Sequence, residues 1–142
     1  MTLEHSITYW TIYTISFSFS EDGFYMYINA KQGRENQATR LFSPNLHASD
    51  NSCFTFWYHM HASSQYESDM GTLRVYKDII QTDRIVWEVS GNQRYKWIKA
   101  AIDIHQGDFK IIFEGIRGSS EKSDIAIDDI SLTKGTCSGT SN

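Results

Sequence analysis

The stretch SDIAIDDISL, residues 123–132, decides the fold class of this chain. Its apolar residues alternate with other residues, as in a β-strand that buries one face, and two adjacent carboxylates interrupt the pattern. Because neighbouring residues of a strand point to opposite faces, Asp128 or Asp129 is expected on the side that Ile125 and Ile127 make apolar. A carboxylate there is costly unless it is paired, hydrogen-bonded or bound to a metal ion. The stretch therefore predicts a late strand and a site.

Alternation of this kind extends over most of the chain. Turn signals at 90–92, 106–108 and 117–120 separate the apolar runs, and no segment has a helical stripe with capping residues. Pro44 is expected to end the strand before it or to lie at a sheet edge. The pattern predicts an all-β chain, an antiparallel sandwich or jelly roll, with strands at 24–28, 38–42, 53–60, 71–76, 84–89, 95–104, 108–115 and 124–132.

Length and charge narrow the class of protein further. A chain of 142 residues is long enough for one domain, and its net charge of −4 is scattered without a block of Lys or Arg. The electrostatic footprint of a nucleic-acid-binding protein is therefore absent. No run approaches the ~18 consecutive apolar residues of a transmembrane helix, so this segment is not expected to insert into a membrane.

The beginning of the chain is apolar and rich in hydroxyl groups between residues 7 and 19. It has no basic n-region and no small-residue cleavage site, which makes it a poor signal peptide, and its β-branched and aromatic content predicts a strand. Either the chain is cut from a larger precursor or its native start is unusual. The final residues, 138–142, are expected to form a linker or tail.

The two cysteines, Cys53 and Cys137, lie far apart in the sequence. They could be two buried free thiols of a cytosolic protein. They could equally form a disulfide, which would close a loop of about 80 residues and contribute about 4 kcal/mol in the chain-entropy model. Spacing alone leaves both interpretations open, and no C-x-x-C pair or Cys/His cluster predicts a zinc site.

A series of short motifs from Gly23 to Cys137 resembles the MAM domain, a module named for meprin, A5 (neuropilin) and receptor tyrosine phosphatase mu. The motifs are GFYMY (23–27), ATRLFSP (38–44), CFTFWYHM (53–60), GTLRVY (71–76), SGNQ (90–93), FEG (113–115) and DIAIDDI (124–130), with Trp87, Trp97 and Cys137. The resemblance implies an extracellular jelly-roll sandwich of two antiparallel sheets that serves in adhesion and receptor assembly. It also implies a Cys53–Cys137 disulfide and hence an oxidising compartment.

The N-terminal part departs from the family pattern. MAM domains usually open with two more cysteines, but residues 1–22 contain none, so the first disulfide of the family is missing. We therefore expect a divergent N-terminal segment with strand character at 1–22, a MAM-like jelly-roll domain at 23–137 and the tail at 138–142.

Asp128 and Asp129 are the first candidates for a binding site. The resemblance, together with calcium binding near the last strand of related jelly rolls, implies that at least one of them is a cation ligand. Glu21 and Asp22 stand where the family often has an acidic residue and are the candidate co-ligands of a structural calcium ion. The alternative is that one aspartate caps a loop through backbone N–H groups while the other faces solvent.

Catalysis has weak support in the sequence. Glu114 and Asp129 could pair as in a glycosidase, but Glu114 between Phe113 and a glycine is rather expected to form a buried salt bridge with Arg74 or Arg117. The serines show no G-x-S-x-G nucleophile pattern. The prediction is that the chain is not an enzyme.

Histidine and aromatic side chains each have a binding and a structural interpretation. His59 and His61 alternate as two metal ligands on a strand would, but no third ligand is close in sequence, which favours a surface or packed pair. Core packing is the commoner role of aromatic residues on alternating strands, and a carbohydrate groove is the alternative for Trp57, Tyr58, Trp87, Tyr95 and Trp97.

The predicted function is a non-catalytic, extracellular protein–protein interaction or adhesion module of a larger secreted or membrane-anchored protein. Its partner would be another protein or a second copy at the cell surface. The alternative function is a carbohydrate-binding β-sandwich module, which exposed tryptophans would favour. A third interpretation is an isolated, non-secreted product whose altered N-terminus prevents folding, which free thiols would mark.

Overall fold

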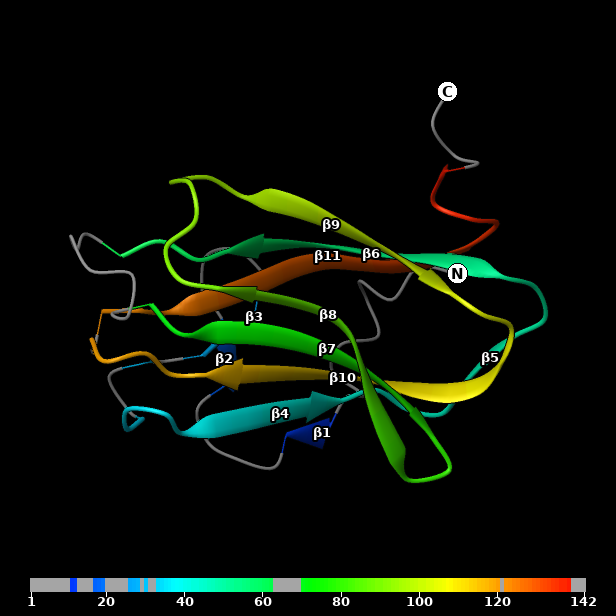
Figure 1. Ribbon diagram of the computed structural model, residues 1–142, viewed down its shortest axis with the longest axis horizontal. Helices are drawn as coiled ribbons and strands as arrows, with labels where there is room; N and C mark the ends of the chain where they lie inside the picture. Colours follow the sequence, from blue (N-terminus) through cyan, green and yellow to red (C-terminus); the bar gives the residue numbers. More distant parts are fainter. Residues whose placement is uncertain are drawn as a thin grey trace.

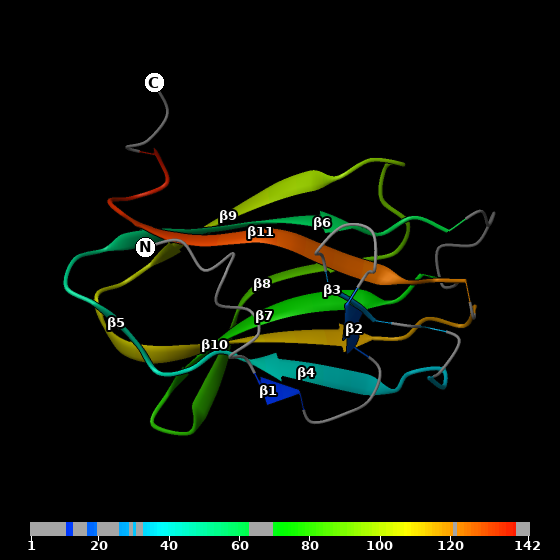
Figure 2. The same cartoon turned by 180° about the vertical axis from the view of Figure 1, so that it is seen from behind.

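The computed structural model describes residues 11–12, 17–19, 26–28, 30, 33–62, 70–120 and 122–138. Within these ranges the chain forms two antiparallel sheets that pack face to face (Figure 1, Figure 2), which confirms the predicted jelly-roll sandwich. The strands are β1 (Thr11–Ile12), β2 (Phe17–Phe19), β3 (Met26–Ile28), β4 (Ala38–Phe42), β5 (Leu46–Ala48), β6 (Ser52–His59), β7 (Thr72–Ile79), β8 (Thr82–Ser90), β9 (Ile98–Ile104), β10 (Gly107–Ile116) and β11 (Ile125–Lys134). No helix in this described part is long and apolar enough to cross a membrane.

The two sheets are built around strands from the end of the chain. The first sheet has the order β1-β4-β10-β7-β8, and β5 also pairs with β10. The second sheet has the order β2-β3-β11-β6-β9. The long strands β10 and β11 are therefore central, and most of their neighbours are far from them in sequence. The stretch at 123–132 thus lies in the middle of the second sheet.

The alternation along β6 separates the core from the outer surface. Phe54, Phe56 and Tyr58 are buried between the sheets, whereas Trp57 and His59 are half-buried on the outer face. This is the pattern expected of a strand with one face in an apolar core. The outer face of the second sheet therefore holds large aromatic side chains that the core does not use.

Among the differences from the predicted strand boundaries, the clearest are at β5, at the β7–β8 connection and at β9. β5 was not predicted, because three residues are too few for a recognisable alternation. β7 continues to Ile79 and β8 begins at Thr82, so both strands are longer than predicted and only a two-residue turn separates them. β9 begins at Ile98 rather than at residue 95, which leaves Tyr95 in the connection before it.

Ser43 and Pro44 separate β4 from β5 as the proline predicted. The backbone N–H of Ser43 donates to the carbonyl oxygen of Ile111 (2.9 Å), and the N–H of Ile111 donates to Oγ of Ser43 (2.8 Å). The Ser43 hydroxyl thus accepts the hydrogen bond that a backbone carbonyl would accept in a regular pair, at the point where the partner of β10 changes from β4 to β5. One edge of β10 is therefore shared between β4 and β5.

The structure joins Cys53 to Cys137 by a disulfide, which confirms the pairing that the resemblance implies. Cys53 lies in β6, and Cys137 follows the end of β11. The N–H of Cys137 also donates to Oδ1 of Asp103 in β9 (2.7 Å). The end of the chain after β11 is therefore attached to two neighbouring strands of the second sheet.

Candidate functional site

The two adjacent aspartates of β11 lie in a β-bulge. Residues Asp128 and Ser131 of β11 pair with Trp57 and Thr55 of β6, so β11 has one residue more than β6 between these pairs. Asp129 has φ 51°. A residue in this left-handed region is typical of such a bulge, where the strand bends and its alternation shifts by one.

The bulge keeps both carboxylates out of the core. Ile125 and Ile127 are buried before it and Ile130 is buried after it, so the inward positions change from odd to even numbers. Asp129 is exposed and Asp128 is half-buried on the outer face of the sheet. The prediction that one aspartate shares the apolar face of Ile125 and Ile127 is therefore wrong, because it assumed an unbroken alternation.

The side chain of Asp128 accepts a hydrogen bond from the backbone of the next residue. Its Oδ1 accepts the N–H of Asp129 (2.9 Å). Burial raises the pKa of Asp128 above its ordinary value, and the charge of Asp129 adds to that effect, while the hydrogen bond opposes it. One aspartate thus accepts a backbone N–H and the other faces solvent, the two features named in the alternative to cation binding.

The predicted co-ligands Glu21 and Asp22 lie outside the described residues. Among those that are described, no group of three or more His, Cys, Asp or Glu side chains is arranged to hold a metal ion. A calcium site that includes Asp128 and Asp129 therefore stays a prediction.

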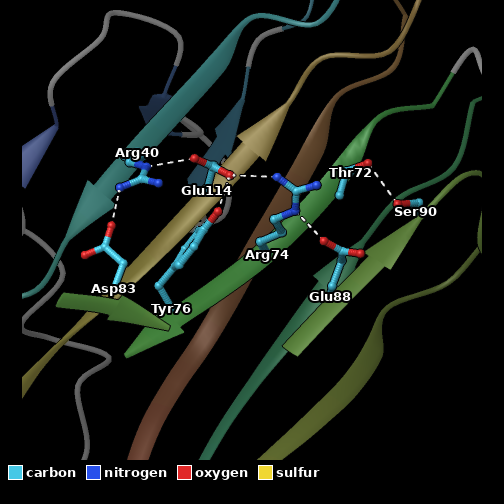
Figure 3. A network of polar contacts seen from close by, with 8 residues as sticks. All are labelled: Arg40, Thr72, Arg74, Tyr76, Asp83, Glu88, Ser90 and Glu114. Carbon is cyan, nitrogen blue, oxygen red and sulfur yellow. Dashed lines mark hydrogen bonds and ion pairs between the residues drawn. The ribbon is translucent and has the colours of Figure 1, made fainter. Parts of the chain in front are cut away.

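Glu114 is the centre of a polar network on the outer face of the first sheet (Figure 3). Its side chain is only 7% exposed. One carboxylate oxygen accepts a hydrogen bond from Nε of Arg40 (2.7 Å), and the other accepts from the hydroxyl of Tyr76 (2.9 Å) and from Nη1 of Arg74 (3.3 Å). Burial alone would raise the pKa of Glu114, but these hydrogen bonds and the charge of Arg40 lower it overall.

Two further carboxylates complete this network from β8. Nη1 of Arg40 donates to Asp83 (2.8 Å), and Nε of Arg74 donates to Glu88. The Arg40 guanidinium also lies 4.7 Å from the centre of the Tyr76 ring. Each charged group in the network thus has a partner of opposite sign, with two guanidinium groups shared among three carboxylates, which makes the network a connected feature of the surface.

Arg74 is confirmed as a partner of Glu114, and Arg117 is not one. Arg117 instead donates from Nε to the carbonyl oxygen of Ala30. Arg40, which the sequence reasoning missed, lies directly opposite Glu114 in the β4–β10 pair. Only the register of two strands separated by about 70 residues in sequence could have revealed it. Glu114 and Asp129, the carboxylates of the glycosidase alternative, lie in different sheets.

The aromatic candidates divide between the core and the outer face. Tyr58 is buried, and the Trp87 ring packs edge-on against it with ring centroids 5.1 Å apart. Trp57 and Trp97 are half-buried on the outer side of the second sheet, and Tyr95 is 80% exposed. A carbohydrate groove that includes Tyr58 and Trp87 is therefore ruled out by their packing, whereas Trp57, Trp97 and Tyr95 lie outside the core.

The two histidines belong to this outer aromatic group. The ring centroid of His59 lies 5.7 Å from that of Tyr95 and 5.6 Å from that of Trp97. The ring centroid of His61 lies 5.1 Å from that of Tyr95. Nδ1 of His61 is hydrogen-bonded to the carbonyl oxygen of Gln93 (3.0 Å). Burial lowers the pKa of His59, and the charge of His61 lowers it further. The pair is packed among aromatic rings, as the structural interpretation expected.

The β7–β8 hairpin ends in an exposed apolar tip, which the sequence reasoning did not find. Ile80 is 93% exposed, and Ile80 and Gln81 have φ 50° and 61°. Positive φ at both central residues is the geometry of a tight hairpin turn that normally contains Asn or Gly. Neither residue stands here, which is why no turn signal marks this position in the sequence. In Figure 1 and Figure 2 the hairpin extends beyond the body of the sandwich.

Beside this tip lies a hollow of about 710 Å³. Its lining includes Ile80 and the neighbouring side chains of Asp78, His47, Asp108 and Phe109. Oδ1 of Asp78 is buried and has no hydrogen-bond partner in the described part of the chain. Such an atom is costly unless a partner satisfies it.

The chain matches a known protein family over nearly its whole length. The family model described as MAM domain, meprin/A5/mu, matches residues 6–138. The chain belongs to the MAM domain family.

Curated relatives of this MAM domain are much longer than the chain itself. It is 40% identical over 134 residues to MAM domain-containing glycosylphosphatidylinositol anchor protein 2 of Mus musculus, a match covering 84% of the chain and 14% of the relative. It is 38% identical over 125 residues to thyroid hormone-induced protein B of Xenopus laevis, covering 84% of the chain and 17% of that protein. The chain therefore corresponds to a small part of each relative.

Solved structures similar to this MAM domain share its fold at low sequence identity. A mutant of the family 29 carbohydrate-binding module CBM29-2 has a TM-score of 0.62 at 15% identity, over 94% of the chain and 87% of the module. The K1 cleaved adhesin domain of Lys-gingipain from Porphyromonas gingivalis W83 has a TM-score of 0.65 at 14% identity, over 89% of the chain and 90% of that domain. At these identities the likeness concerns the β-sandwich fold alone.

Proposed function

We propose that this MAM domain is a non-catalytic extracellular module for protein–protein contact within a larger secreted or membrane-anchored protein. The observation that supports this most is the tip of the β7–β8 hairpin, where Ile80 is almost fully exposed in a left-handed conformation. A β-branched residue at positive φ is unfavourable, and strained, exposed positions of this kind cluster at functional sites. Ile79 and Ile85 are also exposed nearby on the same hairpin. Several large apolar side chains exposed on one projecting hairpin are typical of an interaction surface.

The hollow beside the tip gives the partner a second point of contact. A backbone N–H or a cationic side chain from the partner would satisfy the buried oxygen of Asp78 while an apolar side chain covers Ile80. The partner in this proposal is another protein or a second copy of the domain at the cell surface. No nucleic-acid partner and no membrane insertion by this segment are part of it.

The extracellular location in the proposal has two supports. The Cys53–Cys137 disulfide is the kind of bond that persists in an oxidising compartment. The names of relatives in Mus musculus and Homo sapiens include a glycosylphosphatidylinositol anchor, which is consistent with a membrane-anchored parent protein.

The division into a divergent segment at 1–22, a domain at 23–137 and a tail at 138–142 also remains a proposal.

Binding by multivalent display tests the proposal. Beads coated with the domain report self-association by clumping, and a fluorescent tetramer of the domain reports binding to cells. We expect at least one of these signals in the wild type, and we expect Ile80→Asp to abolish it. The matched control is Lys122→Ala, an exposed substitution in the segment before β11, which should keep the signal. If Ile80→Asp binds as well as the wild type, or neither assay gives a signal, the proposal is wrong.

A structural calcium ion bound by Asp128 and Asp129, with Glu21 and Asp22 as co-ligands, is a separate part of the proposal. Burial disfavours the charged form of Asp128, which a bound cation would offset. If the site exists, calcium should raise the melting temperature relative to EDTA, and Asp129→Asn should reduce that rise. Equal melting temperatures of the wild type in calcium and in EDTA would remove the ion from the proposal.

The alternative function, a carbohydrate-binding module, is favoured by aromatic side chains on the outer side of the second sheet. Trp57 and Trp97 are half-buried there, and Tyr95 is exposed and lies against His59. Aromatic rings that the core leaves uncovered are available for stacking against a ligand.

A further inference from the structure

We infer that the outer face of β6, β9 and β11 binds a neutral oligosaccharide, which rests on the carbohydrate-binding alternative above and specifies its ligand class and its site. The face is named here the aromatic face and consists of the outward side chains of Trp57, His59, Trp97, Tyr95, Lys99 and Asp128. It lies on the second sheet, whereas the hairpin tip belongs to the first. Sugar binding there therefore does not depend on protein contact through Ile80.

The strand register places opposite charges on the two sides of one indole ring. Trp57 of β6 pairs with Asp128 of β11 on one side and with Lys99 of β9 on the other. Side chains directly opposite each other on one face of an antiparallel pair have Cβ atoms about 4.5–5.5 Å apart. One row across three strands therefore offers a hydrogen-bond acceptor, an aromatic ring and a donor.

A second group of rings continues the aromatic face along β6. His59 follows Trp57 after roughly 7 Å of strand and contacts Trp97 and Tyr95. Tyr95 lies against His59 and His61 at ring-centroid distances of 5.7 and 5.1 Å, yet it remains 80% exposed. The core does not need this ring, and its surface is left for a ligand.

This combination of groups matches the chemistry of a sugar. A sugar ring has an apolar C–H face, which stacks on an aromatic ring, and a rim of hydroxyl groups, which donate to carboxylates and accept from ammonium groups. Binding sites place a few polar groups beside a mainly aromatic lining for this purpose. Trp57 would hold the C–H face, while Asp128 and Lys99 would bind hydroxyl groups on either side.

The charges of the aromatic face favour a neutral ligand over an acidic one. The ammonium group of Lys99 is accompanied by two carboxylates outside the core, those of Asp128 and Asp129, and the chain as a whole has a net charge of −4. A sulfated or uronic-acid chain would be repelled by that net charge and by Asp128. The rings extend along β6 from Trp57 to His59 and Tyr95, so a chain of several sugars fits better than a monosaccharide.

Titration with defined hexasaccharides tests this inference. The probes are cellohexaose, mannohexaose and chitohexaose, with a heparin-derived hexasaccharide as the acidic comparison. Binding is measured by calorimetry and by the amide chemical shifts of the 15N-labelled domain. We expect at least one neutral probe to bind, with shifts concentrated in β6, β9 and β11, and the acidic probe to bind more weakly. Trp57→Ala should weaken that binding about tenfold or more.

Two exposed substitutions keep the test valid if Trp57→Ala does not fold. Tyr95→Ala and Lys99→Ala alter exposed side chains and should each weaken neutral-probe binding several-fold in a folded domain. Ile80→Asp is the matched control on the other sheet and should leave sugar affinity unchanged while it abolishes protein contact. The two proposals can therefore fail separately.

Three results would overturn the inference. The first is no heat and no shift change at millimolar concentrations of every neutral hexasaccharide. The second is binding whose shifts lie on the first sheet or whose affinity Tyr95→Ala and Lys99→Ala do not change. The third is a concentration-dependent shift of the same β6 and β9 amides without sugar, which would assign the aromatic face to self-association.

Discussion

Phe56 of β6 packs edge-on against Phe113 of β10, with ring centroids 5.0 Å apart and ring planes at 88°. The two rings belong to opposite sheets, and both are fully buried. Edge-to-face contact is a preferred arrangement of aromatic pairs and adds to the gain from burying their apolar area. This pair therefore holds the two layers of the sandwich together near its centre.

Phe113→Ala is expected to destabilise the domain by about 3–5 kcal/mol, because it leaves a cavity between the sheets that the surrounding strands fill only in part. Urea unfolding followed by tryptophan fluorescence measures the change in the free energy of unfolding. Tyr95→Ala, which removes an exposed ring, should change it by less than about 1 kcal/mol. Similar losses for the two variants would contradict the central position of Phe113.

Glu114→Gln is expected to destabilise the domain by about 1–3 kcal/mol at neutral pH, because Arg40 and Arg74 lose their shared negative partner. The folded-state pKa of Glu114 is lower than the ordinary value of 4.5. The stabilisation is therefore fully present above about pH 4.5 and is lost as the pH falls through the lower folded-state pKa. Free energies of unfolding for wild type and variant, measured from pH 7 downward, should converge at acidic pH. A constant difference at every pH would show that the charge of Glu114 does not contribute.

Gly71→Ala is expected to disrupt the start of β7. A Cβ atom at this position would lie 1.7 Å from the carbonyl oxygen of Ile116, and that backbone group cannot move without breaking the β7–β10 pairing. Gly33→Ala is the matched control, because the nearest atom to its Cβ would belong to the flexible side chain of Arg117, at 3.3 Å. Thermal melts should show a loss of many degrees for Gly71→Ala and a small change for Gly33→Ala. Equal melting temperatures would contradict the close approach at Gly71.

Reduction of the Cys53–Cys137 disulfide is expected to cost about 2–5 kcal/mol of stability, because the unfolded chain gains the freedom that the cross-link removes. The comparison is a thermal melt with and without reductant. A Cys53→Ala/Cys137→Ala double variant, whose melting temperature should not respond to reductant, is the control. An unchanged midpoint on reduction would mean that the strand pairing of β6 and β11 suffices without the bond.

Much of the fold could be predicted because the alternation along each long strand is local. The inward set Phe54, Phe56 and Tyr58 and the outward set Trp57 and His59 follow from one strand alone. The same rule could have separated the core aromatic residues from the surface ones, since Trp57 and Tyr58 are adjacent. Disulfide pairing came from the resemblance to the family, because spacing left it open.

What the sequence could not show depends on register or on local backbone geometry. Arg40 meets Glu114 only because β4 and β10 pair at that point. The turn at Ile80 has none of the residues that usually signal it. The same limit applies to Trp57, whose neighbours Asp128 and Lys99 come from strands on both sides of β6.

Because of the bulge in β11, the effect of deleting one residue from this strand depends on the position of the deletion. Ile127 and Ile130 are three positions apart and both face inward, so deleting Asp129 would leave them two apart, as a regular strand requires. Deleting Ser131 instead would bring Leu132 next to Ile130 and turn it toward solvent. β11 can therefore lose one residue between Ile127 and Ile130 and still keep its apolar side chains in the core. A deletion elsewhere among its buried positions would turn some of these side chains toward solvent.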